Sequence, residues 1–423
     1  MSYPPQLTSA EQVLVETARD FAREQVAPHA AGWERERRVP LETFRAAAEA
    51  GLARLLPPPA LGGHGVSRTA LAAVMEELAA ACLPFAFMLV VHNNLAGNIA
   101  ANGSPGQIER FLPPLLSGER VGAFCLTEPG AGSDAAAIVT SAREEPDARE
   151  EAKEQGAQGG WERGWVLDGE KSWITNGAVA GLFSVYAQSD PSAGWRGIVC
   201  LLVEGDTPGL TRLPPYALLG GHAMGAAGLV LSECRVPPEN LLLPAGRAFK
   251  AAMEGIDLAR TVVAAMCCGL LRSGLETALE YTKGRRAFGR SIAEFQGLQW
   301  QLADVSTDLA AARLLTYDAA ARLDRGAAAR LDRGAAPASE RGEDAAAARS
   351  AVETSLAAAH AKKFATRVAL RGVAECMQAM GAEGLKAEHP LGRHLASAKI
   401  AQYLDGTTEI QNVVISRALF GGR

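Results

Sequence analysis

The sequence predicts a multidomain α+β protein in which a helical N-terminal domain, a middle β-domain and a C-terminal helical bundle follow one another. Three observations predict it: helical periodicity up to about residue 120, short β-type runs up to about residue 242, and long helical periodicity from there to residue 423. The chain is too long for one compact core, and its 48% apolar residues are enough for two or three. We therefore expect domains at residues 1–120, 121–242 and 243–423.

The N-terminal domain opens with a helix-start signal. Thr8 and Glu11 have the spacing of a capping box, and the apolar residues that follow share one helical face: Leu14, Ala18, Phe21 and Ala22. The Pro- and Gly-rich residues 57–65 break this pattern before a second helical region, which starts near Arg68. Three residues are expected to close that region: Pro113, Pro114 and Gly118.

Short β-type runs predict the middle domain. Residues 183–187, 198–203 and 229–231 are rich in β-branched, aromatic or other apolar side chains, and Gly, Pro, Ser or Asp bound them. Residues 143–160 interrupt the domain with charged side chains and almost no large apolar ones. For that segment we expect a solvated loop or an unstable surface helix.

Long Ala-rich helices with Leu and Val predict the C-terminal bundle. Within it, the sequence Arg-Leu-Asp-Arg-Gly-Ala-Ala at 322–328 recurs once at 330–336, and polar residues follow. A repeat architecture needs at least about three units. A lengthened loop between two helices, over residues 327–343, is therefore expected.

Composition excludes several classes of partner. With 42 basic and 47 acidic residues, the net charge of −5 favours neither nucleic acid nor an anionic membrane. The seven cysteines form no CxxC pair, which is typical of a reduced cytoplasmic protein. The closest histidines, His389 and His394, have no matching ligand set, so no metal site is expected. The N-terminus lacks a signal-peptide pattern, and the longest strongly apolar run, 262–271, is shorter than the ~20 residues that span a bilayer.

Three segments carry candidate chemistry. Residues 126–134 read Leu-Thr-Glu-Pro-Gly-Ala-Gly-Ser-Asp, residues 171–177 read Lys-Ser-Trp-Ile-Thr-Asn-Gly, and residues 403–411 read Tyr-Leu-Asp-Gly-Thr-Thr-Glu-Ile-Gln. Gly130 and Gly132 let the backbone approach a ligand, although for these glycines alone an ordinary turn is the favoured explanation. They do not form a dinucleotide-binding Rossmann fingerprint, because the third glycine and the following helix are missing.

Aromatic and basic residues give two further indications. If Trp173 and Thr175 lie in a strand, their side chains share a face on which a flat aromatic ligand could rest; a buried core Trp is the alternative. Arg285 and Arg286 follow a predicted helix and suit a pyrophosphate, or they mark a solvated helix end.

Together, these segments resemble the acyl-CoA dehydrogenase family of flavoproteins. The resemblance covers nearly the whole chain, with residues 143–160 and 327–343 as insertions. It implies a helical N-terminal domain, a middle β-domain and a C-terminal four-helix bundle, with FAD between them in a homo-oligomer, a dimer or a tetramer. It also implies an acyl thioester substrate and an electron-transfer flavoprotein as electron acceptor.

The resemblance assigns residues by position. The flavin would be lined by Phe124, Leu126, Thr127, Gly132, Ser133, Trp173, Ile174 and Thr175. The rest of the cofactor would contact Arg285, Phe288, Gln296, Gln378, Gly381, Thr407 and Glu409. The substrate would contact Ser133, Asp257, Arg260 and Gly406.

Asp405 is the candidate catalytic base, where the family usually has Glu. The alternative base position of the family corresponds to Ala259 here, which cannot take a proton. Asp is one methylene shorter than Glu, and a related branch that oxidises nitroalkanes has Asp at this position. The resemblance thus implies FAD-dependent α,β-dehydrogenation of an acyl-CoA, with three alternatives: an acyl group on a carrier protein, a nitroalkane oxidase, or a non-catalytic flavin-binding protein.

Overall fold

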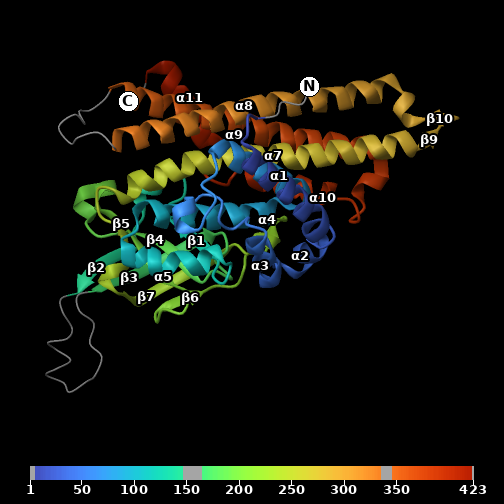
Figure 1. Cartoon of the computed structure of the whole chain (residues 1–423). Coiled ribbons are helices and arrows are strands. Elements are labelled where there is room, and N and C mark those ends of the chain that lie inside the picture. The colour runs from blue at the N-terminus through green and yellow to red at the C-terminus, as the bar shows by residue number, and fades with distance from the viewer. Residues whose placement is uncertain (1–4, 146–163, 335–344, 422–423) are drawn as a thin grey trace.

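A computed structural model of the chain describes residues 5–145, 164–334 and 345–421. Helices form both ends of the described chain and a sheet forms its middle (Figure 1), which confirms the predicted fold class. The limits expected for the three domains stay predictions. The long helices α7, α8 and α9 lie along one side of the molecule, and the sheet lies on the other (Figure 1).

The N-terminal helices pack around α4. Their bounds are α1 Ser9–Phe21, a π-helix Ala22–Val26, α2 Ala30–Glu36, α3 Leu41–Glu49, α4 Arg68–Asn102 and α5 Pro105–Leu116. The predicted capping box is present, since the Thr8 side chain accepts from the Glu11 N–H and the Glu11 carboxylate accepts from the Thr8 N–H. Pro113 and Pro114 do not end α5 as predicted; the helix continues to Leu116 before Gly118, whose φ is 72°. Phe85, in α4, stacks near Phe21 and Trp33 in the core.

The middle domain is an eight-stranded sheet in the order β6-β7-β3-β2-β4-β5-β8, with β1 pairing parallel to β4. The strands are β1 Gly122–Cys125, β2 Ser141–Glu145, β3 Gly164–Ile174, β4 Leu182–Gln188, β5 Ile198–Glu204, β6 Leu210–Arg212, β7 Ala227–Val236 and β8 Leu241–Leu243. The predicted runs at 183–187, 198–203 and 229–231 are thus confirmed as β4, β5 and β7. Of the expected loop at 143–160, residues 143–145 instead end β2, and the remainder lies outside the described residues.

The C-terminal domain consists of α7 Ala248–Gly284, α8 Gln296–Gly334, α9 Ala345–Met380, α10 Leu391–Ala401 and α11 Thr408–Phe420. A two-stranded hairpin, β9 Arg286–Ala287 and β10 Arg290–Ser291, joins α7 to α8. The expected loop at 327–343 is wrong for its first part, because α8 runs through both copies of Arg-Leu-Asp-Arg-Gly. Ala, Arg and Leu are strong helix formers and outweigh the two glycines. Residues 335–344 lie outside the described part.

Two helices, α4 and α7, are long and apolar enough to cross a membrane. Their most apolar 18-residue windows are 83% and 72% buried inside the protein. Burial of this extent is typical of core helices, so the two helices give only weak evidence for a membrane span.

Candidate active site

Asp405 lies in the turn that joins α10 to α11. Its backbone has a φ of 50°, in the left-handed region that Asp tolerates better than most residues, and Gly406 follows with a φ of 94°. Thr407 then caps α11, because its side-chain oxygen accepts from the Ile410 N–H. The turn is therefore fixed by its own sequence at one end.

Three side chains from other positions hold the carbonyl groups of this turn. The Arg260 Nε donates to the Asp405 carbonyl at 3.1 Å. The Lys362 Nζ donates to the carbonyls of Gln402 and Gly406, and the Gln411 amide also donates to the Gly406 carbonyl, at 3.1 Å. Helices α7, α9 and α11 thus all fix the backbone that carries Asp405.

The Asp405 side chain is left free by this arrangement. Its Oδ2 atom is buried and has no hydrogen-bond partner among the described residues. Burial raises the pKa of Asp405 to about 6, against the positive charges of Lys362 and Arg260, which lower it. A carboxylate with such a pKa is a stronger base than one in water and is still ionised at neutral pH.

Asp257 and Arg260 lie beside the Asp405 turn, and their contact with the substrate stays a prediction. Both project from α7, and the Arg260 guanidinium bridges the Asp257 carboxylate, at 2.9 Å, and the Asp405 carbonyl. Ser355 donates to the same Asp257 oxygen at 3.2 Å. Burial raises the pKa of Asp257, which the Arg260 charge partly offsets. Unlike Asp405, Asp257 has its oxygen occupied by donors.

Trp173 and Thr175 lie where β3 ends, but not on one strand face. Trp173 has a φ of 60° and a side chain that is 59% exposed, whereas Thr175 follows the strand and is buried. Both the shared strand face and the alternative of a buried core Trp are therefore wrong. The Trp173 ring instead packs against the Tyr216 ring in a tilted arrangement, with ring centroids 4.5 Å apart, and keeps an open aromatic surface.

The loop after β1 contains Leu126 to Asp134, and a buried ion pair stabilises it. Lys171 donates to Glu128 at 2.7 Å and to the Leu126 carbonyl at 3.2 Å. Glu128 also accepts from the backbone N–H groups of Val139 and Thr140. The loop is open at Gly132, where an added Cβ atom would have no neighbour within 4 Å.

Met224 belongs to a loop that lies between Thr175 and helix α10, which precedes the Asp405 turn. The Thr175 hydroxyl lies 3.9 Å from its sulfur. A Cβ atom on Gly221 would lie 3.1 Å from the Met224 methyl and 2.6 Å from Ile400 of α10. The loop at 221–224 therefore lies between Thr175 and Ile400 of α10, the helix that precedes the Asp405 turn.

The predicted cofactor residues form two separate groups. Phe124, Leu126, Thr127, Gly132, Ser133, Trp173, Ile174 and Thr175 lie in the β-domain, and Thr407 and Glu409 lie at the start of α11. Arg285, Phe288, Gln296, Gln378 and Gly381 lie instead at the β9–β10 end of the long helices, beyond the sheet (Figure 1). Phe288 there is 94% exposed with a φ of 51°.

These features fit FAD, the expected cofactor. The exposed Trp173 face would cover a flat ring system, and the buried Ser172 hydroxyl has no partner among the described residues. The open surface at Gly132 leaves room for a ligand beside the backbone. The individual contacts to FAD stay predictions.

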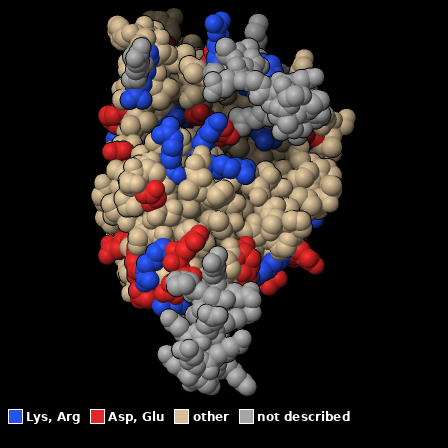
Figure 2. All heavy atoms as spheres, turned by 90° about the vertical axis from the view of Figure 1, so that its left-hand side faces the viewer, with Lys and Arg blue, Asp and Glu red and all other residues tan. Residues whose placement is uncertain are grey.

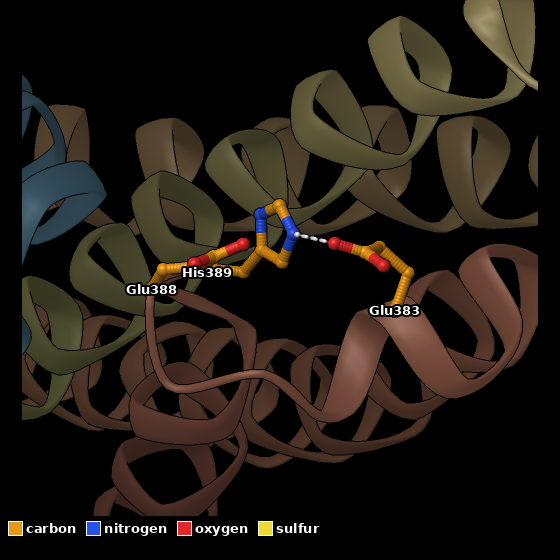
Figure 3. A group of neighbouring side chains, drawn as sticks. All are labelled: Glu383, Glu388 and His389. Atoms are coloured by element: carbon orange, nitrogen blue, oxygen red, sulfur yellow. Dashed lines mark ion pairs between the residues drawn. The ribbon is translucent and has the colours of Figure 1, made fainter.

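One cluster has side chains of the kind that bind metal ions (Figure 3). Glu383, Glu388 and His389 have potential ligand atoms within 4.8 Å of one another, among the residues described. Lys386 pairs with Glu383 at 2.8 Å and with Glu388 at 3.6 Å, so surface ion pairs account for the two carboxylates. His394 does not join them, since it is buried against Ser273 of α7.

The sequence reasoning missed Lys362, Tyr216 and the Lys171–Glu128 pair. Lys362 has a detectable signal, because it interrupts a stripe of small apolar residues on one face of a helix: Ala358, Ala361, Ala365 and Ala369. A Lys in such a stripe must find acceptors inside the protein. Its partners lie some 40 residues further along the chain, and no local pattern names them.

Three family models match the chain. The N-terminal domain of acyl-CoA dehydrogenase matches residues 8–119, the middle domain matches 123–234, and the C-terminal domain matches 246–420. The short-chain specific acyl-CoA dehydrogenase, mitochondrial, of Mus musculus is 34% identical over 412 residues, which is 97% of this chain and 90% of that protein.

Solved structures agree with these matches. Butyryl-CoA dehydrogenase from Megasphaera elsdenii has a TM-score of 0.85 at 32% identity, covering 99% of this chain and 100% of that one. A chain from a structure described as the electron transferring flavoprotein of Acidaminococcus fermentans has the same TM-score at 33% identity and the same coverage. The chain therefore belongs to the acyl-CoA dehydrogenase family of FAD-dependent oxidoreductases.

Proposed function

We propose that this protein oxidises an acyl-CoA thioester between its α- and β-carbons, with Asp405 as the base that removes the α-proton. The observation that carries the proposal is the Asp405 carboxyl itself. Its Oδ2 atom is buried and has no hydrogen-bond partner among the described residues, and burial raises the pKa of the carboxyl to about 6. An unpaired carboxylate of this kind is available to a substrate in a way that Asp257, held by Arg260 and Ser355, is not.

The backbone around Asp405 supplies a second element. The N–H groups of Asp405 and Gly406 donate no hydrogen bond within the described structure. An N–H group aimed at the thioester carbonyl would stabilise the negative charge that develops when the α-proton leaves. The carbonyl groups of Asp405 and Gly406 are occupied by Arg260, Lys362 and Gln411, which leaves the two N–H groups and the carboxyl of this turn available to a substrate.

FAD supplies the other half of the reaction when it is bound, by accepting the hydride equivalent from the β-carbon. Trp173 and the loop at Gly132 would hold the cofactor, and the Asp405 turn would present the base to the acyl chain. Because Asp is about 1.5 Å shorter than Glu, the substrate must approach the turn more closely than a Glu would require.

Charge on one face supports CoA as the thioester carrier. Figure 2 shows Lys and Arg side chains gathered around a hollow on the upper half of this face, while Asp and Glu crowd its lower edge. Helix α7, which begins at this end of the molecule (Figure 1), has Arg247 as its N-cap and Lys250 in its first turn. Basic side chains suit the phosphates of a CoA nucleotide.

We also propose a homo-oligomer that passes its electrons to an electron-transfer flavoprotein in the cytoplasm. The remote group at Arg285 and Phe288 supports oligomerisation, because its exposed aromatic and basic side chains could complete the cofactor site of a second copy. The electron acceptor rests on the likeness to the Acidaminococcus fermentans structure.

Anaerobic mixing of the FAD-loaded protein with short, branched and medium acyl-CoAs tests the base. Flavin bleaching is expected with at least one thioester, and Asp405→Asn should slow it by about 10²–10⁴-fold. Asp257→Asn, which alters a neighbouring buried carboxylate, should cost less. Wild-type bleaching by Asp405→Asn would refute the proposed base. Bleaching only by carrier-bound acyl groups or nitroalkanes would instead refute the CoA thioester.

A further inference from the structure

Lys362 is a buried cation at the back of the Asp405 turn. Only 1% of the residue is exposed, and it projects from the middle of α9. A buried ammonium group is costly unless acceptors surround it. Lys362 has main-chain acceptors, the carbonyls of Gln402 and Gly406, rather than a carboxylate in direct contact.

These two carbonyls flank the proposed base. Gln402 is the C-cap of α10, where the last carbonyl groups of a helix lack partners within it. Gly406 directly follows Asp405, and both residues have left-handed backbone conformations. Lys362 therefore links the C-terminal end of α10, at Gln402, to Gly406. Asp405 lies between these two residues in the chain.

The charge of Lys362 also acts on the carboxyl group. The titratable and charged groups that interact with Lys362 are Asp405 and, from the neighbouring helices, Arg260 and Cys267 of α7 and Glu409 of α11. Burial lowers the pKa of Lys362 to about 8, so it is mostly cationic at neutral pH. Burial raises the pKa of the Cys267 thiol to about 12, so that group stays neutral.

We propose that Lys362 is a positioning residue for the reaction: it fixes the Asp405–Gly406 turn through main-chain carbonyls and keeps the Asp405 carboxyl ionised. The inference rests on the proposed function, since it assumes that Asp405 is the base. Arg260 holds the same turn from α7, but its charge is shared with Asp257. Lys362 has no such second carboxylate in direct contact within the described structure.

The test replaces Lys362 by Met, which keeps most of the unbranched side chain and removes the charged ammonium group. Lys399→Met is the matched control, because Lys399 contacts the same turn only through side chains, the Gln402 amide oxygen at 2.9 Å and the Tyr403 ring. Two quantities are measured on FAD-loaded protein: the pH profile of anaerobic bleaching, and hydrogen–deuterium exchange over residues 402–411.

In Lys362→Met, the apparent pKa of bleaching should rise by about one pH unit, the rate at pH 7 should fall by about tenfold or more, and exchange in the turn should increase. Lys399→Met should keep the wild-type apparent pKa. If Lys362→Met does not retain FAD, Lys362→Gln, which keeps an uncharged donor, takes its place.

An unchanged apparent pKa with unchanged exchange would overturn the role of Lys362, and so would an equal shift in Lys399→Met. Failure of the proposed function gives a different result. In that case Asp405→Asn bleaches like the wild type, whatever Lys362→Met does.

Discussion

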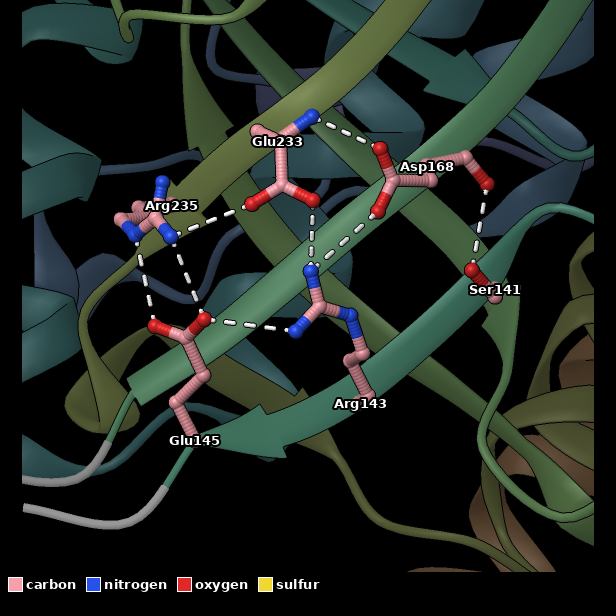
Figure 4. Close-up of polar contacts among 6 residues, drawn as sticks. All are labelled: Ser141, Arg143, Glu145, Asp168, Glu233 and Arg235. Carbon is pink, nitrogen blue, oxygen red and sulfur yellow. Dashed lines mark hydrogen bonds and ion pairs between the residues drawn. The ribbon is translucent and has the colours of Figure 1, made fainter.

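Two clusters of charged residues in this protein contain similar side chains but differ in whether their carboxyl groups have hydrogen-bond partners. The Asp405 cluster comprises Asp405, Asp257, Arg260 and Lys362, all wholly or partly buried between helices. The surface ladder comprises Arg143, Glu145, Asp168, Glu233 and Arg235, which lie across β2, β3 and β7 (Figure 4). Both clusters have two cations, but only one of them leaves a carboxyl group unsatisfied.

The difference lies in what the cations contact. In the ladder they bind carboxylates directly, with Arg143 at 2.7 Å from Glu233 and Arg235 at 3.2 Å from Glu145. In the Asp405 cluster, Lys362 binds carbonyls, and Arg260 divides its donors between a carbonyl and Asp257. The positive charges of Lys362 and Arg260 therefore act on the Asp405 carboxyl without a hydrogen bond to its Oδ2 atom. Such a group destabilises the fold and is chemically available, whereas the ladder is satisfied and inert.

The Lys171–Glu128 pair is a third case for this comparison. It is buried, as the Asp405 cluster is, but its carboxylate binds a cation directly, as in the surface ladder. Lys171→Met would leave Glu128 buried without its cation, and such losses typically cost about 3–5 kcal/mol. We expect a large fall in the melting temperature of the holoenzyme and weaker FAD retention, since the pair supports the loop at Leu126. Adding Glu128→Gln should recover part of the loss. A melting temperature equal to the wild type would contradict this role.

Asp405→Asn should make the protein more stable while it slows flavin bleaching. The pKa of Asp405 in the folded protein, about 6, is above the ordinary value of 3.8. The stability contributed by the protonated carboxyl is therefore full below about pH 4 and is lost as the pH rises through 6. The increase in the pKa of Asp405 corresponds to a change of no more than about 3 kcal/mol in the free energy of unfolding. Partial exposure of the residue reduces that change to about 1–2 kcal/mol.

Thermal melts of the two holoenzymes between pH 4 and pH 8 measure this effect. The melting temperatures should agree near pH 4, and the Asn variant should melt about 1–2 °C higher at pH 7. A constant difference across the range, or a less stable Asn variant at pH 7, would show that the Asp405 carboxyl is satisfied in the folded protein.

The sequence predicts the fold well because its signals are local. The capping box at Thr8 and the apolar run at 183–187 depend on neighbouring residues, and both form as predicted. The predicted loop at 327–343 fails over residues 327–334 for a related reason: there the helix propensity of Ala, Leu and Arg outweighs the polar residues and the glycines.

The site is predicted less completely because its geometry depends on distant contacts. Asp405 and Arg260 follow from family resemblance, but the hydrogen bond between them joins residues 145 positions apart. The strand-face prediction for Trp173 and Thr175 fails because the backbone at Trp173 turns to a positive φ where β3 leaves its register with β7. Alternation of side chains holds only in a regular strand.

The surface ladder should respond least to substitution. The Arg143 and Arg235 side chains are each 50% exposed, and exposed ion pairs are typically worth about 0.2–1 kcal/mol. Arg143→Ala removes contacts to Glu145, Asp168 and Glu233 together, so we expect a loss near 1 kcal/mol at low salt that shrinks as salt screens the charges. Arg38→Ala, which breaks a single exposed pair at 3.9 Å, should leave the melting temperature unchanged. A loss at Arg143 that persists at high salt would mean that the ladder supports the sheet through packing rather than charge.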